Sequence, residues 1–180
     1  MPNRGNINLQ PHHLQDDIVY LKPIVETDFD RLFKVAADPS IWEQHPSRDR
    51  YKKEVFQLYF DSAISSGSAF LIAETSTNRL IGCTRFYDYN PALSRIAIGY
   101  TFLAKEYWGG KYNRAVKKLL LDYAFQFVHS VVFHIGPTNI RSQQAILRLG
   151  AKQIGEEHYN GTLQFLYEIR RSDWLISSAG

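Results

Sequence analysis

The chain has 180 residues, of which 44% are hydrophobic and 22% are charged, which is ordinary for a globular protein with one buried core. Its formal net charge of +3 suits an acidic small ligand but is too small to indicate a nucleic-acid-binding surface. The single cysteine, Cys83, excludes an internal disulfide and a cysteine-based zinc site, so we expect no metal.

No apolar stretch approaches the roughly 20 residues that a membrane-spanning helix needs. The first 17 residues are polar and lack the apolar core of a signal peptide. The sequence therefore predicts a cytoplasmic protein whose partners include neither a membrane nor a nucleic acid. We expect residues 1–17 to form a flexible arm, residues 18–175 to form one domain and residues 176–180 to form a tail.

The first half of the chain reads as a strand, two helices and three strands. Residues 18–21 are apolar enough for a strand, and helices are expected over 27–36 and 51–64 from their apolar spacing. Strands are then expected over 69–73, 80–87 and 95–103, with turn residues between them. Strands that follow one another with such short connections predict an antiparallel meander.

The second half begins with a long amphipathic helix over about 112–128, whose apolar residues recur at helical period. A short strand over 131–135 and a helix over 141–149, ended by Gly150, come next. Asn160-Gly161 predicts a hairpin between strands 152–159 and 162–169. The order β-α-α-β-β-β-α-β-α-β-β predicts an α/β fold with a mixed, mostly antiparallel central sheet and helices on both faces.

The segment 107–114, Tyr-Trp-Gly-Gly-Lys-Tyr-Asn-Arg, joins the strand over 95–103 to the long helix. Paired glycines let bare backbone N–H groups approach a ligand, and a helix N-terminus carries partial positive charge. The turn therefore suits an anion such as a pyrophosphate. A plain tight connection is the alternative interpretation of the same residues.

Three segments together carry a resemblance: Glu106–Asn113 with the following helix, Asn139–Ser142 with Leu149–Ala151, and Asp38–Trp42. In this order and spacing they resemble the GNAT superfamily of acetyl-CoA-dependent N-acetyltransferases. The nearest likeness is to the RimJ/RimL type, the ribosomal-protein N-terminal acetylases. The resemblance covers about residues 18–175 and implies the acyl-CoA N-acyltransferase fold.

The resemblance implies acetyl-CoA as cofactor and assigns its contacts residue by residue. Backbone groups of Phe102 and Leu103 would meet the pantetheine arm and the reacting carbonyl oxygen. The pyrophosphate would rest on the N–H groups at the start of the long helix, from Gly109, Gly110, Lys111, Tyr112, Asn113 and Arg114. The chain departs from the family's Gln/Arg-x-x-Gly-x-Gly/Ala pattern, because Trp108, Lys111 and Asn113 replace its first residue, central glycine and last small residue.

Three further residues receive roles from the resemblance. Asn139 would hold the parted strand or the cofactor arm, and it also suits a helix N-cap. Ser142 would contact the cofactor and protonate the departing thiolate, with a capping hydroxyl as the alternative. His134, five residues before Asn139, would be the general base, directly or through one water, since Ala97 on the other candidate strand cannot titrate. A structural strand histidine is the alternative.

The implied reaction is direct attack of a primary amine on acetyl-CoA in a ternary complex. We expect Trp42, Tyr87 and Tyr159 to line the acceptor site. A peptide N-terminus, an aminoglycoside-like drug, a polyamine and a small metabolite remain open as acceptors, and a homodimer is possible. The altered glycine pattern motivates an alternative: a catalytically weak acyl-CoA-binding or sensory protein on the same fold.

Overall fold

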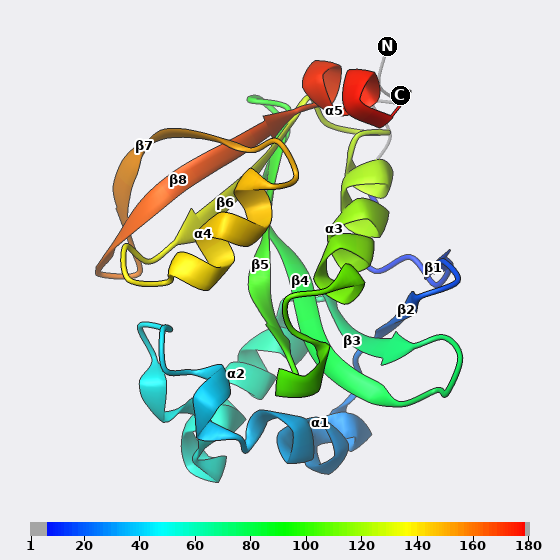
Figure 1. Ribbon diagram of the computed structural model, residues 1–180, viewed down its shortest axis with the longest axis vertical. Helices are drawn as coiled ribbons and strands as arrows, with labels where there is room; N and C mark the ends of the chain where they lie inside the picture. Colours follow the sequence, from blue (N-terminus) through cyan, green and yellow to red (C-terminus); the bar gives the residue numbers. More distant parts are fainter. Residues whose placement is uncertain (1–6, 179–180) are drawn as a thin grey trace.

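The computed structural model describes residues 7–178 and arranges them around an eight-stranded sheet of order β1-β2-β3-β4-β5-β6-β8-β7 (Figure 1). The strands are β1 (Leu14–Gln15), β2 (Val19–Pro23), β3 (Ala69–Glu74), β4 (Leu80–Asn90), β5 (Arg95–Leu103), β6 (Ser130–Ile135), β7 (Lys152–Tyr159) and β8 (Thr162–Arg170). The helices are α1 (Phe29–Ala36), α2 (Lys53–Ser65), α3 (Lys111–Ala124), α4 (Ile140–Leu147) and α5 (Arg171–Ser178).

The sheet is mixed and mostly antiparallel, as predicted. Strands β2 to β5 form an antiparallel meander, and β5 pairs with β6 in parallel after the crossover through α3. The predicted hairpin is confirmed: β7 pairs with β8, and Asn160 and Gly161 have φ angles of 49° and 76°. Both residues need positive φ in this two-residue turn, which asparagine and glycine tolerate best.

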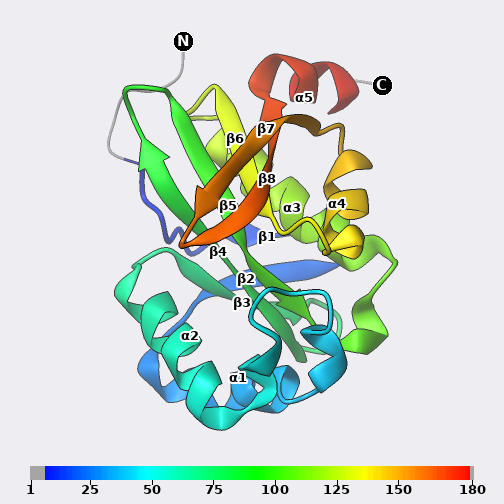
Figure 2. The same ribbon diagram turned by 90° about the vertical axis from the view of Figure 1, so that its left-hand side faces the viewer.

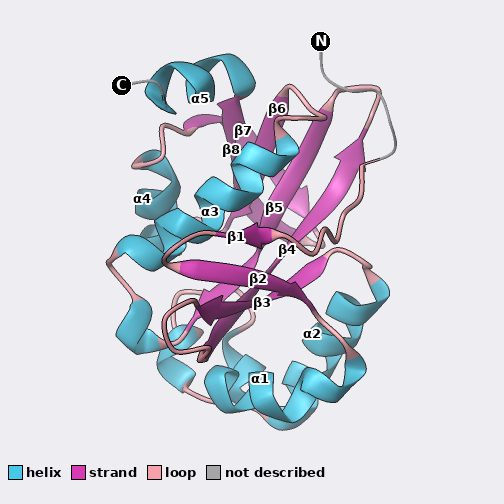
Figure 3. Cartoon of the chain, turned by 90° about the vertical axis from the view of Figure 1, so that its right-hand side faces the viewer, coloured by secondary structure: helices cyan, strands magenta, loops and turns pink. Residues whose placement is uncertain are grey.

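Each face of the sheet carries its own apolar core. Alternation along the strands sends Phe70 and Ile72 to one core and Leu71 to the other. The first core includes Leu120 of α3 and Ile146 of α4, and the second contains buried residues of α1 and α2 such as Phe56. Figure 3 shows α3 lying across the sheet, with α1 and α2 gathered at one end of the molecule.

Both ends of the described chain hold more regular structure than the sequence suggested. Within the predicted arm, Leu14–Gln15 forms β1 beside β2, and the Gln10 side chain donates to the Ala69 carbonyl at 2.8 Å. Residues 1–6 of that arm lie outside the described residues, as do residues 179 and 180 of the predicted tail. The helix α5 follows β8 directly and was not predicted.

The strands β5 and β6 part after a short parallel pairing. They pair only where Arg95–Ala97 meets Ser130–Val132, although β5 continues to Leu103 and β6 to Ile135. Figure 1 shows the two strands diverging. Beyond this point, the register of β5 with β4 shifts opposite Gly99–Phe102, and Tyr100 has a φ of 51°. A non-glycine residue at positive φ beside a register shift is typical of a β-bulge.

The bulge depends on a glycine in the neighbouring strand. A Cβ added at Gly82 of β4 would lie 2.0 Å from the Phe102 carbonyl oxygen, which no side chain tolerates. The absence of a side chain at this position therefore lets β5 press against β4 while it bends away from β6. Local sequence thus sets the place where the sheet opens.

Candidate active site

The turn before α3 leaves the first N–H groups of that helix without a side-chain cap. Gly109 has a φ of 67°, and Gly110 is the extended N-cap residue. The N-cap makes no side-chain hydrogen bond, and the first turn of α3 contains no acidic residue. A Cβ added at Gly110 would meet only the Trp108 carbonyl at 3.8 Å, so the space in front of the turn is open. An open, uncapped helix start suits an anionic ligand.

Two side chains at the start of α3, Tyr112 and Lys111, make contacts within the protein. The Tyr112 hydroxyl donates to the Glu74 carboxylate on β3, and the Tyr112 ring packs edge-on against Tyr107. The Lys111 ammonium lies 5.5 Å from the Tyr112 ring centre, Arg114 is exposed, and Asn113 is half-buried. Because no side chain caps this helix start, its main-chain N–H groups are free to bind a ligand.

Trp108 connects this turn to the end of β5 and the start of α4. Its indole N–H donates to the Leu103 carbonyl at 2.8 Å, and the Arg141 guanidinium lies 3.7 Å from the centre of its ring. Arg141 also donates to the Ile41 carbonyl at 3.0 Å. The sequence-based hypothesis gave the Leu103 backbone to the pantetheine arm. In this structure its carbonyl already accepts one hydrogen bond, so a ligand that uses it either shares the oxygen with the indole or displaces the indole.

At the start of α4 the predicted N-cap is present, because the Asn139 side chain accepts a hydrogen bond from the Ser142 N–H at 3.2 Å. The Ser142 side chain is half-buried, and its hydroxyl makes no hydrogen bond to the described residues. That hydroxyl can therefore serve a ligand. Phe102 is buried, with its ring 5.1 Å from that of Trp42.

His134 joins two side chains that lie far from it in sequence. Its Nδ1 lies 2.7 Å from the Tyr87 hydroxyl, and its Nε2 lies 2.6 Å from Glu157 Oε1. The His134 side chain is 7% exposed, whereas the Glu157 side chain is 44% exposed. Because a carboxylate oxygen only accepts, Nε2 carries the proton and Nδ1 accepts from the Tyr87 hydroxyl. The three groups form a hydrogen-bonded chain from the protein interior to solvent.

Aromatic rings hold this chain in place. The Tyr159 ring stacks on His134 at 4.5 Å, and the Tyr87 ring packs edge-on against Tyr100 at 5.1 Å. Gly99 makes room for Tyr87: a Cβ there would lie 2.9 Å from the Tyr87 ring and 3.2 Å from its hydroxyl. The Tyr87 hydroxyl therefore lies over β5, close to the bulge. Burial raises the pKa of Tyr87, so its hydroxyl stays protonated at neutral pH.

The predicted site residues thus separate into groups. Tyr87, Tyr159 and His134 come together, and Phe133 faces the opposite core, as strand alternation requires. Trp42 is 2% exposed, and its indole N–H donates to the Ala36 carbonyl, so this ring lies behind the site.

Glu157 and Arg85, which were not among the predicted site residues, lie here as well. Each stands two residues before a predicted tyrosine on the same strand, so same-face spacing was the signal that could have found both.

The buried residue Lys117, which lies beneath the bulge, should make the free energy of unfolding depend on pH. Lys117 of α3 is 4% exposed and donates to the Thr101 hydroxyl at 2.6 Å, and burial lowers its pKa to about 7. Between pH 7 and 10.5 the unfolded chain keeps a proton that the folded chain releases, so the free energy of unfolding should rise with pH in this window.

Lys117→Met should abolish that rise and increase the free energy of unfolding at pH 7 by about 1–3 kcal/mol, because it removes a poorly solvated charge. Urea unfolding of the parent and the variant at pH 7 and pH 9.5 measures both effects. The control is Lys118→Met, which removes the exposed neighbouring charge and should leave the pH dependence intact. An equally steep rise in Lys117→Met would contradict the assignment.

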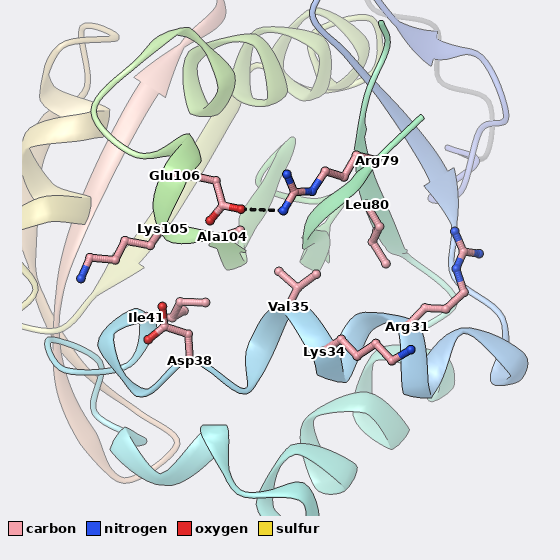
Figure 4. Close-up of a pocket in the computed structure, with 10 residues that line it drawn as sticks. All are labelled: Arg31, Lys34, Val35, Asp38, Ile41, Arg79, Leu80, Ala104, Lys105 and Glu106. Atoms are coloured by element: carbon pink, nitrogen blue, oxygen red, sulfur yellow. Dashed lines mark hydrogen bonds and ion pairs between the residues drawn. The ribbon is translucent and has the colours of Figure 1, made fainter. Parts of the chain in front are cut away.

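A separate groove lies under the other side of the turn (Figure 4). It has a volume of about 450 Å³ and is lined by residues of α1, the start of β4 and the segment 104–106. The ion pair between Arg79 and Glu106, at 2.8 Å, crosses it. None of the predicted site residues lines this groove, so it is distinct from the site at His134 and Gly110.

The fold and the turn together define a class. A sheet that opens between two parallel strands, followed by an uncapped glycine turn and a helix, is the arrangement of an acyl-CoA-dependent N-acyltransferase. The sequence model of the acetyltransferase (GNAT) domain matches residues 19–152, and the chain belongs to this family. The family transfers acetyl groups from acetyl-CoA, so the protein is an N-acetyltransferase that uses this cofactor.

Solved structures show the same fold. A GCN5-related N-acetyltransferase from Brucella melitensis is 17% identical with a TM-score of 0.76, covering 89% of this chain and 79% of that one. Spermidine N-acetyltransferase from Vibrio cholerae, in complex with CoA and spermine, is 17% identical with a TM-score of 0.68, covering 89% and 99%. AAC(6')-Ib, in complex with ribostamycin and coenzyme A, is 17% identical with a TM-score of 0.72, covering 88% and 97%.

No curated protein matches the sequence. Within the described residues, no helix has both the length and the apolar character to cross a bilayer, and no group of three or more potential metal ligands is found.

Proposed function

We propose that this protein transfers the acetyl group of acetyl-CoA to a primary amine by direct attack in a ternary complex, in the manner of the RimJ/RimL-type enzymes that it resembles in sequence. The acceptor is a small-molecule amine or a peptide N-terminus, and the setting is the cytoplasm. One observation carries the proposal: the open turn at Gly110 and the Tyr87–His134–Glu157 chain border the same bent segment of β5.

The residues present fit the cofactor at the turn. The N–H groups of residues 110–113 would hold the pyrophosphate, with Gly109 before them and Arg114 after them, because no side chain caps this helix start and the space in front of Gly110 is open. Backbone groups of Phe102 and Leu103, with Asn139 beside them, would hold the pantetheine arm where β5 and β6 part. The bound cofactor supplies an activated acetyl thioester, and a main-chain N–H of the bulge would polarise its carbonyl.

The hydrogen-bonded chain would remove the proton of the acceptor ammonium. Both nitrogens of His134 are engaged by protein groups, so His134 would act through Tyr87 rather than directly. The Tyr87 hydroxyl would accept the proton as its own passes to Nδ1 of His134. The Nε2 proton would pass to Glu157, whose exposure allows release to solvent. The Ser142 hydroxyl would protonate the departing thiolate.

The same residues also support a second function, a weakly catalytic acyl-CoA-binding protein. The bond between Trp108 and the Leu103 carbonyl, and the lysine in place of the family's central glycine, favour it. Both functions need a CoA site, and only the first needs the proton-removing chain.

Two measurements on the full chain separate these functions. Acetyl-CoA should raise the melting temperature in a saturable manner, and thiol release should follow when peptides and small amines are added. Saturable binding without thiol release for any acceptor would support the second function. The absence of any stabilisation by acetyl-CoA would contradict both.

A further inference from the structure

Two arginine side chains lie beside the Tyr87–His134–Glu157 chain, on the face of the sheet that α2 covers. Arg85 of β4 is two residues from Tyr87 and donates to the Ser62 hydroxyl of α2 at 3.0 Å. Its guanidinium lies 3.4 Å from the centre of the Tyr100 ring. Arg50 lies 5.0 Å from the Tyr59 ring centre, and its guanidinium is 3.1 Å from Nε2 of His45.

The two cations belong to one cluster. The Tyr59 hydroxyl donates to the Tyr100 carbonyl at 2.6 Å, which joins the ring under Arg50 to the residue under Arg85. Burial lowers the pKa of Arg50, and the nearby Arg85 charge lowers it further. The guanidinium groups thus repel each other across a tyrosine pair.

Neither arginine has an acidic partner among residues 7–175, whose side chains are described. The ion pairs in this region involve other residues, and Arg85, 5% exposed, keeps its Nε atom buried without a hydrogen bond. Burial and the Arg50 charge lower the pKa of His45 to about 3, so this contact of Arg50 is neutral at pH 7. Two carboxylates beside the Tyr87–His134–Glu157 chain are engaged elsewhere, because Glu157 pairs with His134 and Asp88 interacts with Tyr159.

Guanidinium groups remain charged at any physiological pH. Arg85 is buried and Arg50 is half-buried, and a buried charge without a counterion is costly, so an anion would stabilise this cluster. An anion bound between the arginines would complete it, and guanidinium groups match carboxylate and phosphate oxygens well. The Tyr100 ring contacts both Arg85 and Tyr87, so only this ring would separate such an anion from Tyr87.

From this geometry we infer that the acceptor amine carries an anionic group, a carboxylate or a phosphate, that Arg50 and Arg85 bind while the amine faces Tyr87. The inference rests on the proposed acetyl transfer and narrows its acceptor class. The relatives solved with spermine and ribostamycin hold cationic molecules. Two unpaired arginines would repel such cations, so polyamines and aminoglycosides should be poor acceptors here.

Matched acceptors test the inference through thiol release from acetyl-CoA. One pair is an alanyl-alanine dipeptide and its C-terminal amide, a second is O-phosphoethanolamine and ethanolamine, and spermidine is the cationic probe. The anionic member of at least one pair should react about tenfold better in kcat/KM than its neutral partner. The pair that shows the larger preference identifies carboxylate or phosphate as the group recognised.

Arg50→Gln should bring the members of that pair within about twofold of each other, because hydrogen bonds to a charged group are lost. Arg50→Lys should keep part of the preference, since it retains the charge. The matched control is Arg48→Gln, which removes an exposed arginine from the same segment and should leave the preference unchanged. Equal rates within both pairs in the parent, or a preference for spermidine, would overturn the inference while leaving acetyl transfer intact.

A binding arm keeps the test independent of turnover. N-acetyl-alanyl-alanine and N-acetyl-phosphoethanolamine should each be compared with a neutral analogue for stabilisation of the protein against heat. Selective stabilisation by an anion that Arg50→Gln abolishes, without thiol release from any amine, would support the anion site and contradict the proposed reaction. Failure of both anions to stabilise the parent, together with no preference in turnover, would contradict the anion site.

Discussion

Gly110→Val should weaken acetyl-CoA binding by about a hundredfold or more, since a branched side chain would occupy the space in front of the N–H groups of α3. The backbone itself tolerates the change. Gly110 has a φ of −119°, and an added Cβ meets only one atom, at 3.8 Å. The loss should therefore appear in calorimetry with acetyl-CoA, while the melting temperature without ligand stays within a few degrees of the parent.

Gly110→Ala is the graded control for this prediction. Its single methyl group should weaken binding less than valine does, because it fills less of the space before the turn. Affinity equal to the parent in both variants would show that the pyrophosphate does not lie at this turn. A large fall in melting temperature would show instead that Gly110 is needed for folding.

Tyr87→Phe should lower turnover by about a hundredfold, because it removes the hydroxyl that links the cleft to His134. His134→Ala should have an effect of similar size, since it interrupts the same chain. The affinity for acetyl-CoA should stay unchanged in both.

Tyr89→Phe supplies the matched control, because it makes the same substitution two residues further along β4 at a ring that packs against the other core.

Gly99→Ala tests the positioning of Tyr87. Its methyl group would push the ring away from His134 and should lower turnover without a comparable loss of stability. If Tyr87→Phe and His134→Ala both turned over as fast as the parent, the Tyr87–His134–Glu157 hydrogen bonds would have a structural role only.

The parts of the fold that depend on local signals could be predicted from the sequence. The periodicity of Ala115, Leu120 and Ala124 predicts α3, and Asn160-Gly161 predicts the β7–β8 hairpin. The strand β1 and the helix α5 were not predicted. Two residues, Leu14–Gln15, are too few for a periodic signal, and pairing with β2 stabilises them. The mixed composition of 171–178 gives no clear apolar stripe.

The candidate site could be predicted only in part, because only some of its contacts are local in the sequence. The turn at Gly109-Gly110 is local, so its character follows from the residues themselves. The partners of His134 come from strands 47 and 23 residues away, and nothing in the local pattern specifies them. The contact between Trp108 and Arg141 likewise depends on how α3 and α4 meet. Long-range pairing of polar groups is set by the folded sheet, and a single sequence carries little information about it.

The central claim is that the N–H groups at the start of α3 hold the diphosphate of acetyl-CoA where β5 and β6 part. A crystal structure with coenzyme A tests it most directly. We expect phosphate oxygens within hydrogen-bond distance of the main-chain N–H groups of residues 110–113. A diphosphate bound away from these N–H groups would contradict this account.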